Sequence, residues 1–237
     1  IDDILKVNKN TGVILLSGNS EEKNALPYVK GVIQAWYPGS EGGRAIADII
    51  SGDVNPSGKL PFTFPLKLED NGAHSFDEVS YPGVNDKQVY KEDILVGYRW
   101  HDTKKIDPLF EFGYGLSYTS FRISSASTDK EKYSENDNIV VSVEIENKGD
   151  REGAEVIQVY ASDVKASVMR PEKELKAFRK VELVPGEKKF IELTIPVSSL
   201  AFFDEDIGAW NIEAGHFKLM IGVSSRDIRK VLAITVE

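Results

Sequence analysis

The C-terminal half of the chain contains several short runs in which every second residue is hydrophobic. Every second residue is aliphatic in 139–145, and the runs 191–195 and 217–223 repeat this spacing. A period of two residues is that of a β-strand with one buried face. Short runs of this strand type fall at 121–125, 139–145, 156–160, 177–183, 191–195, 217–223 and 231–236. Short strands between turn residues predict an immunoglobulin- or fibronectin-like β-sandwich.

The N-terminal half follows a different pattern. Residues 13–16 form a short, continuous apolar run, which is typical of a strand covered on both faces, and a second run follows at 32–37. A helix is predicted after the second run, because apolar residues recur at helical spacing between Ala45 and Ile50. Ser40 is placed to act as its N-cap and Gly52 as its glycine stop. Strand, loop, helix and strand make a βαβ unit.

The predicted parallel sheet is incomplete. Only about three strand candidates precede residue 65, which is too few for a sheet covered on both faces. We therefore expect the rest of this sheet to come from sequence that precedes Ile1.

Residues 59–118 are irregular and rich in aromatic, glycine and proline residues. A loop of this length is ordered only when its side chains pack against something else. We interpret it as a strap that packs at an interface. The predicted organisation is therefore an α/β segment with this strap over residues 1–118 and an all-β domain over residues 119–237.

Composition narrows the classes of partner. A net charge of -9 and a pI near 5.0 disfavour nucleic acid and anionic membrane surfaces, which both select basic stripes. The absence of cysteine excludes disulfides, thiolate zinc sites and cysteine nucleophiles. No apolar run reaches the ~20 residues of a membrane-spanning helix. The start at Ile1 has neither an initiator methionine nor a signal peptide, so we expect a processed, truncated or split chain. The compartment stays open between bacterial cytoplasm, periplasm and secretion.

Histidine, serine and glycine-rich loops often form catalytic or binding sites, but in this sequence none of them shows the spacing of a known site. His74, His101 and His216 lack the spacing of metal ligands, so we predict no metal site. Ser17 ends a strand without the Gly-x-Ser-x-Gly frame of a nucleophile elbow and is interpreted as a strand-end residue. The glycine-rich loop at 38–43 lacks the lysine of a phosphate-binding loop and is interpreted as a strand-to-helix turn.

Carboxylates are numerous, and several are candidates for acid/base work. In glycosidases, such work needs two carboxyl groups roughly 5–9.5 Å apart across the substrate. With 38 acidic residues in the chain, the sequence does not show which of them meet. A solvated or structural role is the default for each candidate, namely Glu41, Glu92, Asp93, Asp102, Asp107 and Glu111.

Four motifs become specific when they are taken together in order. They are AWYPGSEGGRAIAD at 35–48, GDVNPSGKLPFTFP at 52–65, VGYRW at 96–100 and FEFGYGLSY at 110–118. This series resembles the C-terminal region of glycoside hydrolase family 3, especially its bacterial β-glucosidases. In the sandwich, ELKAFRK at 174–180 followed by PGE at 185–187 is similar to the fibronectin type III-like domain of those enzymes.

The resemblance implies an N-terminal (β/α)8-like barrel, then an α/β sandwich domain that ends within 1–118, then the fibronectin-like domain. Enzymes of this type retain the anomeric configuration, with an Asp nucleophile in a Ser-Asp-Trp-type motif and a Lys-His pair on the barrel. Their acid/base Glu lies in a Ser-Gly-Glu-Gly-type loop before the strand that matches 13–16. These motifs do not occur here, and the SGNS sequence at 17–20 does not match. No catalytic, cofactor-binding or metal-binding residue is therefore assigned.

These observations favour the C-terminal portion of a retaining, exo-acting β-glucosidase that hydrolyses terminal β-D-glucosyl residues. The partner would be the missing barrel and α/β segment, either as covalent parent or as separate chain, and β-glucosides would bind through that parent. We expect the isolated chain to be inactive and to need no cofactor. The alternatives are a β-xylosidase or other glycosidase of the same family, and a non-catalytic carbohydrate-binding or structural module that uses Phe202, Phe203 and Trp210.

Overall fold

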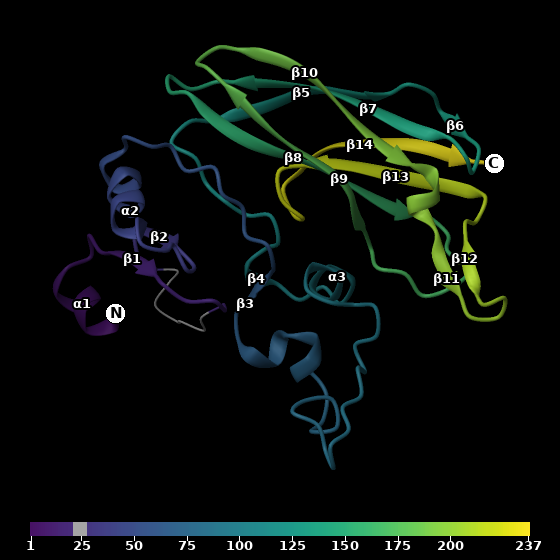
Figure 1. Ribbon diagram of the computed structural model, residues 1–237, viewed down its shortest axis with the longest axis horizontal. Coiled ribbons are helices and arrows are strands. Elements are labelled where there is room, and N and C mark those ends of the chain that lie inside the picture. Colours follow the sequence, from purple (N-terminus) through teal and green to yellow (C-terminus); the bar gives the residue numbers. More distant parts are fainter. Residues whose placement is uncertain (21–27) are drawn as a thin grey trace.

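In the computed structural model, which describes residues 1–20 and 28–237, a β-sandwich lies beside an open N-terminal segment (Figure 1). The sandwich contains β5 (Phe121–Thr128), β6 (Lys132–Tyr133), β7 (Asn138–Asn147), β8 (Gly153–Asp163), β9 (Glu174–Leu183), β10 (Lys188–Pro196), the short 3-10 helix η4 (Val197–Leu200), β11 (Phe202–Asp204), β12 (Ala209–Asn211), β13 (Gly215–Gly222) and β14 (Ile228–Val236). The predicted α/β segment followed by an all-β domain is confirmed.

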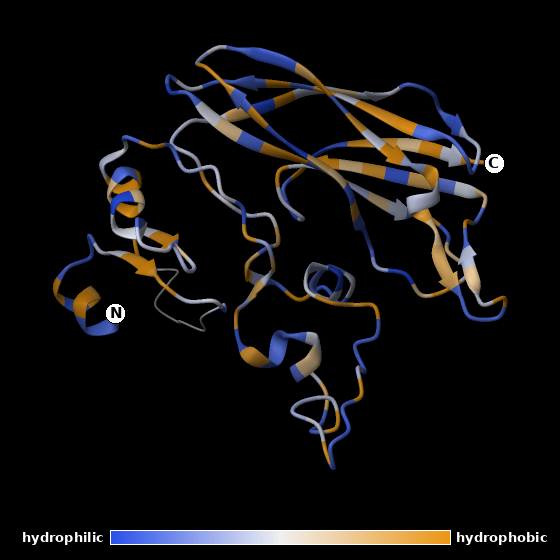
Figure 2. Ribbon diagram, viewed as in Figure 1, coloured by the Kyte–Doolittle hydropathy of each residue, from blue (hydrophilic) through white to orange (hydrophobic). Residues whose placement is uncertain are grey.

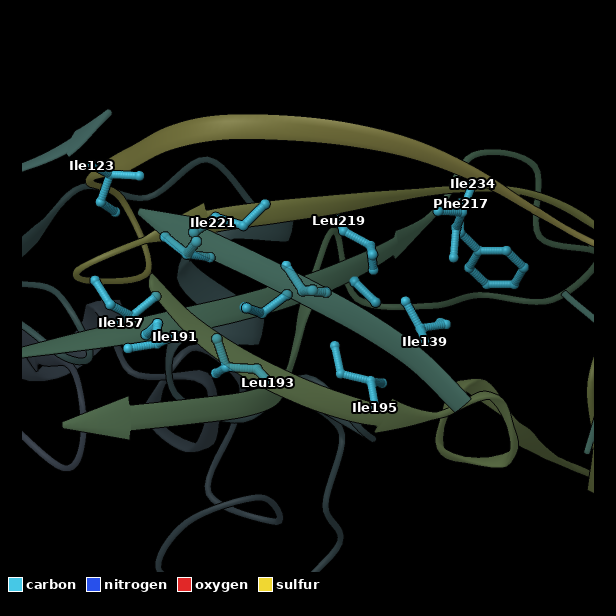
Figure 3. Packing of buried hydrophobic residues seen from close by; sticks show 14 of the residues in the cluster. Ile123, Ile139, Ile157, Ile191, Leu193, Ile195, Phe217, Leu219, Ile221 and Ile234 are labelled. Atoms are coloured by element: carbon cyan, nitrogen blue, oxygen red, sulfur yellow. The ribbon is translucent and has the colours of Figure 1, made fainter. Parts of the chain in front are cut away.

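Two sheets face each other in the sandwich. One has the strand order β6-β14-β13-β8-β9 and the other the order β10-β7-β5, while β11 and β12 form a separate hairpin. Val141 of β7 lies opposite Leu193 of β10. Figure 3 shows side chains of both sheets, among them Leu219 of β13, meeting between the two layers. The buried cluster lies entirely between Ile123 and Val236, and each of its larger aliphatic side chains contributes about 1.5–3 kcal/mol.

The period-two pattern predicted these strands well. Each of the seven predicted runs lies in an observed strand, apart from Val223, which follows β13. Figure 2 shows the alternation of hydrophobic and hydrophilic residues along these strands. The pattern missed β6, β11 and β12, because strands of two or three residues are too short to show a period.

The N-terminal segment holds α1 (Asp2–Val7), β1 (Gly12–Leu15), β2 (Gly31–Gln34) and α2 (Gly42–Ser51). Strands β1 and β2 pair in parallel and form a sheet of two strands among the described residues. The helices found in the described ranges are at most ten residues long, and none of them is long and apolar enough to cross a membrane.

Two sequence predictions for this segment were wrong. Within the part of the chain that the structure describes, the run 13–16 is not covered on both faces, because Leu15 is buried whereas Ile14 is 42% and Leu16 62% exposed. Residue Ser40 does not cap α2. The N-cap is Glu41, whose side chain makes no capping hydrogen bond.

Other features of the same segment agree with the sequence. Gly52 ends α2 in the left-handed conformation, with a φ of 83°, as predicted. Strand β2 ends earlier than expected because Trp36 has a φ of +54°, a region that non-glycine residues rarely adopt. The apolar face of α2 is only partly covered, because Ile46 and Ile49 are half-buried whereas Ile50 is 61% exposed.

The strap, residues 59–118, connects this segment to the sandwich. It contains β3 (Phe64–Pro65), the short 3-10 helices η2 (Leu68–Asp70) and η3 (Gly72–His74), α3 (Tyr98–Thr103) and β4 (Pro108–Phe110). Strands β3 and β4 pair antiparallel. The Phe64 ring contacts Trp36, Phe62 and Phe110 at centroid distances of 6.1, 5.3 and 6.2 Å. Aromatic packing therefore orders the strap.

Candidate functional site

The junction, where residues 98–118 of the strap lie on the outer face of the five-stranded sheet, brings together much of the candidate chemistry. Tyr98 of α3 stacks on Phe112 at a centroid distance of 4.9 Å and meets Tyr160 of β8 edge-on at 5.7 Å. The Tyr98 hydroxyl accepts a 2.8 Å hydrogen bond from the backbone N–H of Leu175 in β9. Burial of these rings, with the polar end of Tyr98 satisfied, fixes the strap on the sheet.

Asp102 is the centre of a buried ion cluster at this junction. Its carboxylate lies 2.9 Å from Lys173 Nζ and 3.0 Å from Arg226 Nε, and both cations belong to the sandwich. Arg226 also donates to Asp107 at 2.7 Å and to the carbonyl of Ile106 at 2.8 Å. A buried carboxylate held by two cations anchors the two regions to each other and is not open to a substrate.

His101, next to Asp102 on α3, is also buried. Its Nδ1 lies 3.2 Å from the carbonyl oxygen of Ile106. Burial lowers the pKa of this imidazole, and the charge of Arg226 lowers it further, against the opposing effects of the Ile106 carbonyl, Asp70 and Asp102. The ring is therefore neutral at pH 7 and acts as a buried packing group.

Glu111 and Gly113 of the FGYG turn also contact the sandwich. Glu111 accepts a 2.7 Å hydrogen bond from the Ser224 hydroxyl. Gly113 has a φ of 80°, and a Cβ atom at this position would lie 2.5 Å from the side chain of Gln158 in β8. Gln158 in turn donates a 2.7 Å hydrogen bond to the carbonyl of Val223. Only glycine fits this close approach of the turn to the sheet.

Two further contacts between the regions lie nearer to α2, one of them a buried ion pair. Lys59 Nζ is 2.7 Å from Glu155 of β8, and the two side chains are 13% and 8% exposed. Asn55 accepts a 2.8 Å hydrogen bond from the backbone N–H of Tyr118 and donates a 2.9 Å one to the carbonyl of Glu152. The strap is thus held by polar contacts near both of its ends, and desolvation strengthens the buried Lys59–Glu155 pair.

Two cavities open at the junction. One, of about 240 Å³, is lined by Lys59, Glu155 and Arg229, and each of these charged groups already has a partner. The other, of about 420 Å³, lies beside Asp102 and Arg226. Neither cavity presents two unpaired carboxylates across an open space, which is what cleavage of a glycosidic bond requires.

The remaining candidate carboxylates do not meet at one place. Glu41 is exposed at the start of α2, and Asp93 is exposed on a turn with a φ of 56°. Asp107 is largely exposed, with a side chain 86% accessible. Glu92 is buried, and its Oε2 has no hydrogen-bond partner among the described residues.

The other candidates are separated as well. His74 lies against Tyr81 with a centroid distance of 4.2 Å, and His216 is exposed with its Nδ1 3.1 Å from the Thr235 hydroxyl. Ser17 donates to the carbonyl of Asn19 at the end of β1. Within the described ranges, no three His, Asp or Glu side chains are grouped closely enough to hold a metal ion.

Sequence reasoning missed the sandwich side of the junction. Lys173, Arg226 and Gln158 are among the sandwich residues that bind the strap, and none of the three was a candidate. A signal for Gln158 was present, because it interrupts the apolar run of β8 and is 3% exposed. A buried polar residue in a strand needs a partner, but sequence alone does not reveal which residue provides it.

Comparison with known proteins shows what this arrangement belongs to. Residues 1–118 match the glycosyl hydrolase family 3 C-terminal domain, and residues 155–225 match a fibronectin type III-like domain. The chain is 51% identical over 229 residues to β-glucosidase BoGH3A of Bacteroides ovatus, and 46% identical over 228 residues to thermostable β-glucosidase B of Acetivibrio thermocellus. These matches cover 97% and 96% of this chain, but 31% and 30% of the two relatives.

Solved structures agree with the sequence matches. The β-glucosidase DesR of Streptomyces venezuelae has a TM-score of 0.93 at 37% identity, over 99% of this chain and 30% of that one. The β-glucosidase of Kluyveromyces marxianus has a TM-score of 0.91 at 41% identity, over 100% of this chain and 27% of that one. The chain thus spans about three tenths of the length of these relatives, where it matches their C-terminal region, and it belongs to glycosyl hydrolase family 3.

Proposed function

We propose that this chain is the C-terminal part of a retaining, exo-acting β-glucosidase that hydrolyses terminal β-D-glucosyl residues. In this proposal residues 1–118 complete the α/β sandwich domain, and residues 119–237 form the fibronectin-like domain that holds it. The observation that carries the proposal is the junction, where the buried Asp102, Lys173 and Arg226 cluster fixes an uncovered α/β segment to a complete sandwich. The β-glucosidase relatives supply the activity and the substrate class.

The proposed role of the chain is supportive. Its candidate carboxylates are ion-paired, dispersed or buried, so we place the nucleophile, the acid/base group and the residues that hold the sugar in the rest of the enzyme. No cofactor is part of the proposal. A bacterial origin is also only proposed, since the relatives include yeasts and filamentous fungi as well as bacteria.

Hydrolysis of 4-nitrophenyl β-D-glucoside tests the proposal. The isolated chain should give no turnover above the buffer rate, whereas the complete enzyme that contains it should hydrolyse the glucoside. A panel of the corresponding xyloside, arabinoside and N-acetylglucosaminide separates a glucosidase from the other glycosidases of the family. Turnover by the isolated chain at the rate of the complete enzyme would contradict the supportive role.

A carbohydrate-binding role for the sandwich is the second candidate. Phe203 and Trp210 face each other across the β11–β12 hairpin at 5.9 Å and are 52% and 72% exposed, whereas Phe202 is half-buried near Arg170. Exposed aromatic rings can stack on sugar rings, but this pair is edge-to-face and offers no continuous flat platform. Titration of the chain with soluble β-glucan, followed by tryptophan fluorescence, tests it against a Trp210→Ala variant, which should abolish any change.

A further inference from the structure

The arm, residues 66–97 of the strap, extends away from the sandwich and carries a surface that no described residue covers (Figure 1). It leaves the junction after β3 and returns to it at α3. Its most exposed large hydrophobic residues are Leu66, Leu68, Tyr81, Val89, Tyr90 and Val96, and Tyr90 and Val96 are 72% and 64% exposed. Several exposed large apolar side chains on one short segment are typical of an interaction site.

The arm is nevertheless a defined structure. Trp100 donates a 3.1 Å hydrogen bond from its indole N–H to the carbonyl of Asp70, and its ring meets Phe76 at a centroid distance of 5.7 Å. A Cβ at Gly72 would lie 3.2 Å from the Trp100 ring, so the arm packs closely on α3. Lys91 pairs with Asp77 at 2.6 Å across the arm. The apolar side chains are therefore presented by an ordered element.

Glu92 supplies the second, independent observation. The residue is 8% exposed, and its Oε2 is buried without a hydrogen-bond donor from any part of the chain that the structure describes. No ion pair to Glu92 occurs within residues 1–20 and 28–237. A buried carboxylate is costly unless it is paired, so this position requires a donor from elsewhere.

The charge of the arm indicates the chemistry of that donor. Residues 66–97 contain seven Asp and Glu residues against three lysines. A second copy of this acidic surface would be repelled, whereas a basic and apolar surface is complementary to it. The relatives are about three times as long as this chain, so most of the enzyme lies outside it.

We propose that the arm is a docking surface for the part of the enzyme that precedes this chain, with Glu92 paired to a lysine or arginine of that part. The inference rests on the proposed function and adds to it a second contact, separate from the unfinished β1–β2 sheet. The arm is joined to the buried junction through α3. It thus fixes the position of the sandwich relative to the rest of the enzyme.

Limited trypsin digestion of the complete enzyme and of the isolated chain tests the docking. Lys87 is exposed on the arm, and Lys165, exposed on the loop after β8, is the matched control. Cleavage after Lys87 should be at least about tenfold slower in the complete enzyme than in the isolated chain, because docking removes the open state. Cleavage after Lys165 should be equal in both. Equal cleavage after Lys87 in the two proteins overturns the proposal.

The variant Glu92→Gln tests the proposed ion pair, because it should change the rate of cleavage after Lys87 in opposite directions in the isolated chain and in the complete enzyme. In the isolated chain it removes an unpaired buried charge, so cleavage after Lys87 should slow down. In the complete enzyme it leaves the partner cation unpaired, so the same cleavage should accelerate, by roughly tenfold if the pair is desolvated. An effect of the same sign in both proteins overturns the pairing. Glucosidase activity of the same wild-type enzyme is measured separately, so failure of the docking is distinguishable from failure of the proposed function.

Discussion

The two regions of the chain differ in where they keep their hydrophobic residues. Among the described residues 1–20 and 28–118, the buried hydrophobic residues are Leu15, Phe64, Leu95 and Trp100, whereas the other described residues of this kind belong to the sandwich. Conversely, 20 of the 30 large hydrophobic residues that are exposed among the described positions lie in residues 1–118. The sandwich thus supplies its own core, whereas the α/β segment and the arm present surfaces that need a partner.

The contact between the two regions is mainly polar, unlike the hydrophobic core of the sandwich. Its centre is formed by buried ion pairs and hydrogen bonds around Asp102, Lys59 and Gln158. Buried polar contacts add little net free energy, but they are satisfied in only one arrangement of their partners. The junction therefore sets the orientation of the open region on the closed one, and the sandwich core provides the stability. Substitutions at the junction and in the core should distinguish the orienting role from the stabilising role.

The largest effect is expected at the ion cluster. Asp102→Ala leaves Lys173 as an unpaired charge that is 7% exposed, so the unfolding free energy should fall by about 3–5 kcal/mol. Urea unfolding followed by tryptophan fluorescence measures this, since Trp100 lies on the same helix. As control, Asp107→Ala removes a partner of Arg226 that is 86% exposed and should cost about 0–1 kcal/mol. Equal losses would contradict the anchoring role of Asp102.

The second prediction compares the loss of a leucine side chain in the sandwich core with the same loss in the α/β segment. Leu219→Ala removes a fully buried side chain from the sandwich and should lower its unfolding free energy by about 2–5 kcal/mol. Leu16→Ala makes the same change at a position that is 62% exposed in the open region, and should cost less than about 0.5 kcal/mol. Circular dichroism during urea unfolding checks both. A large loss for Leu16→Ala would show that the α/β segment has a core of its own.

The third prediction concerns the close approach at the junction. Gly113→Ala introduces a Cβ against Gln158 at a φ of 80°, so strain and overlap together should cost about 2–4 kcal/mol. Gly186 in the β9–β10 turn has a φ of 74° but no atom within 4 Å of the added Cβ, so Gly186→Ala should cost about 1–2 kcal/mol. Thermal melting of both variants gives the difference, which is the contribution of the overlap alone.

The smallest effect is a dependence of stability on pH. Burial lowers the folded-state pKa of His101 below that of the unfolded chain, where histidine has a pKa of about 6.5. The unfolded state therefore binds more protons in the window between the two values, and stability is lost as the pH falls from about 6.5. The slope from this residue is at most ~1.4 kcal/mol per pH unit. His101→Gln should flatten the curve of melting temperature against pH between 7 and 5.5, and an unchanged curve contradicts the assignment.

The sequence predicted the sandwich because its strands are long enough for several cycles of the two-residue period, as in β7 and β10. It predicted burial of β1 on both faces, which the described residues do not provide, because a continuous apolar run indicates burial without identifying the side chains that cover it. In the sequence, nothing distinguished Asp102 from the other candidate carboxylates. Its partners Lys173 and Arg226 lie 71 and 124 positions away along the chain, so the tertiary fold alone brings them together. Gly113 was part of a motif, but the reason for glycine appeared only with Gln158 in place.

Hydrogen exchange of the isolated chain, measured by mass spectrometry, tests the contrast between the two regions most directly. Amides of the sandwich strands β7, β8 and β13 should exchange only through global unfolding, whereas those of β1, β2 and α2 should exchange by local opening that is at least about a hundredfold more frequent. In the complete enzyme the second group should become protected. Equal protection of both groups in the isolated chain would contradict the conclusion that residues 1–118 depend on the rest of the enzyme for their cover.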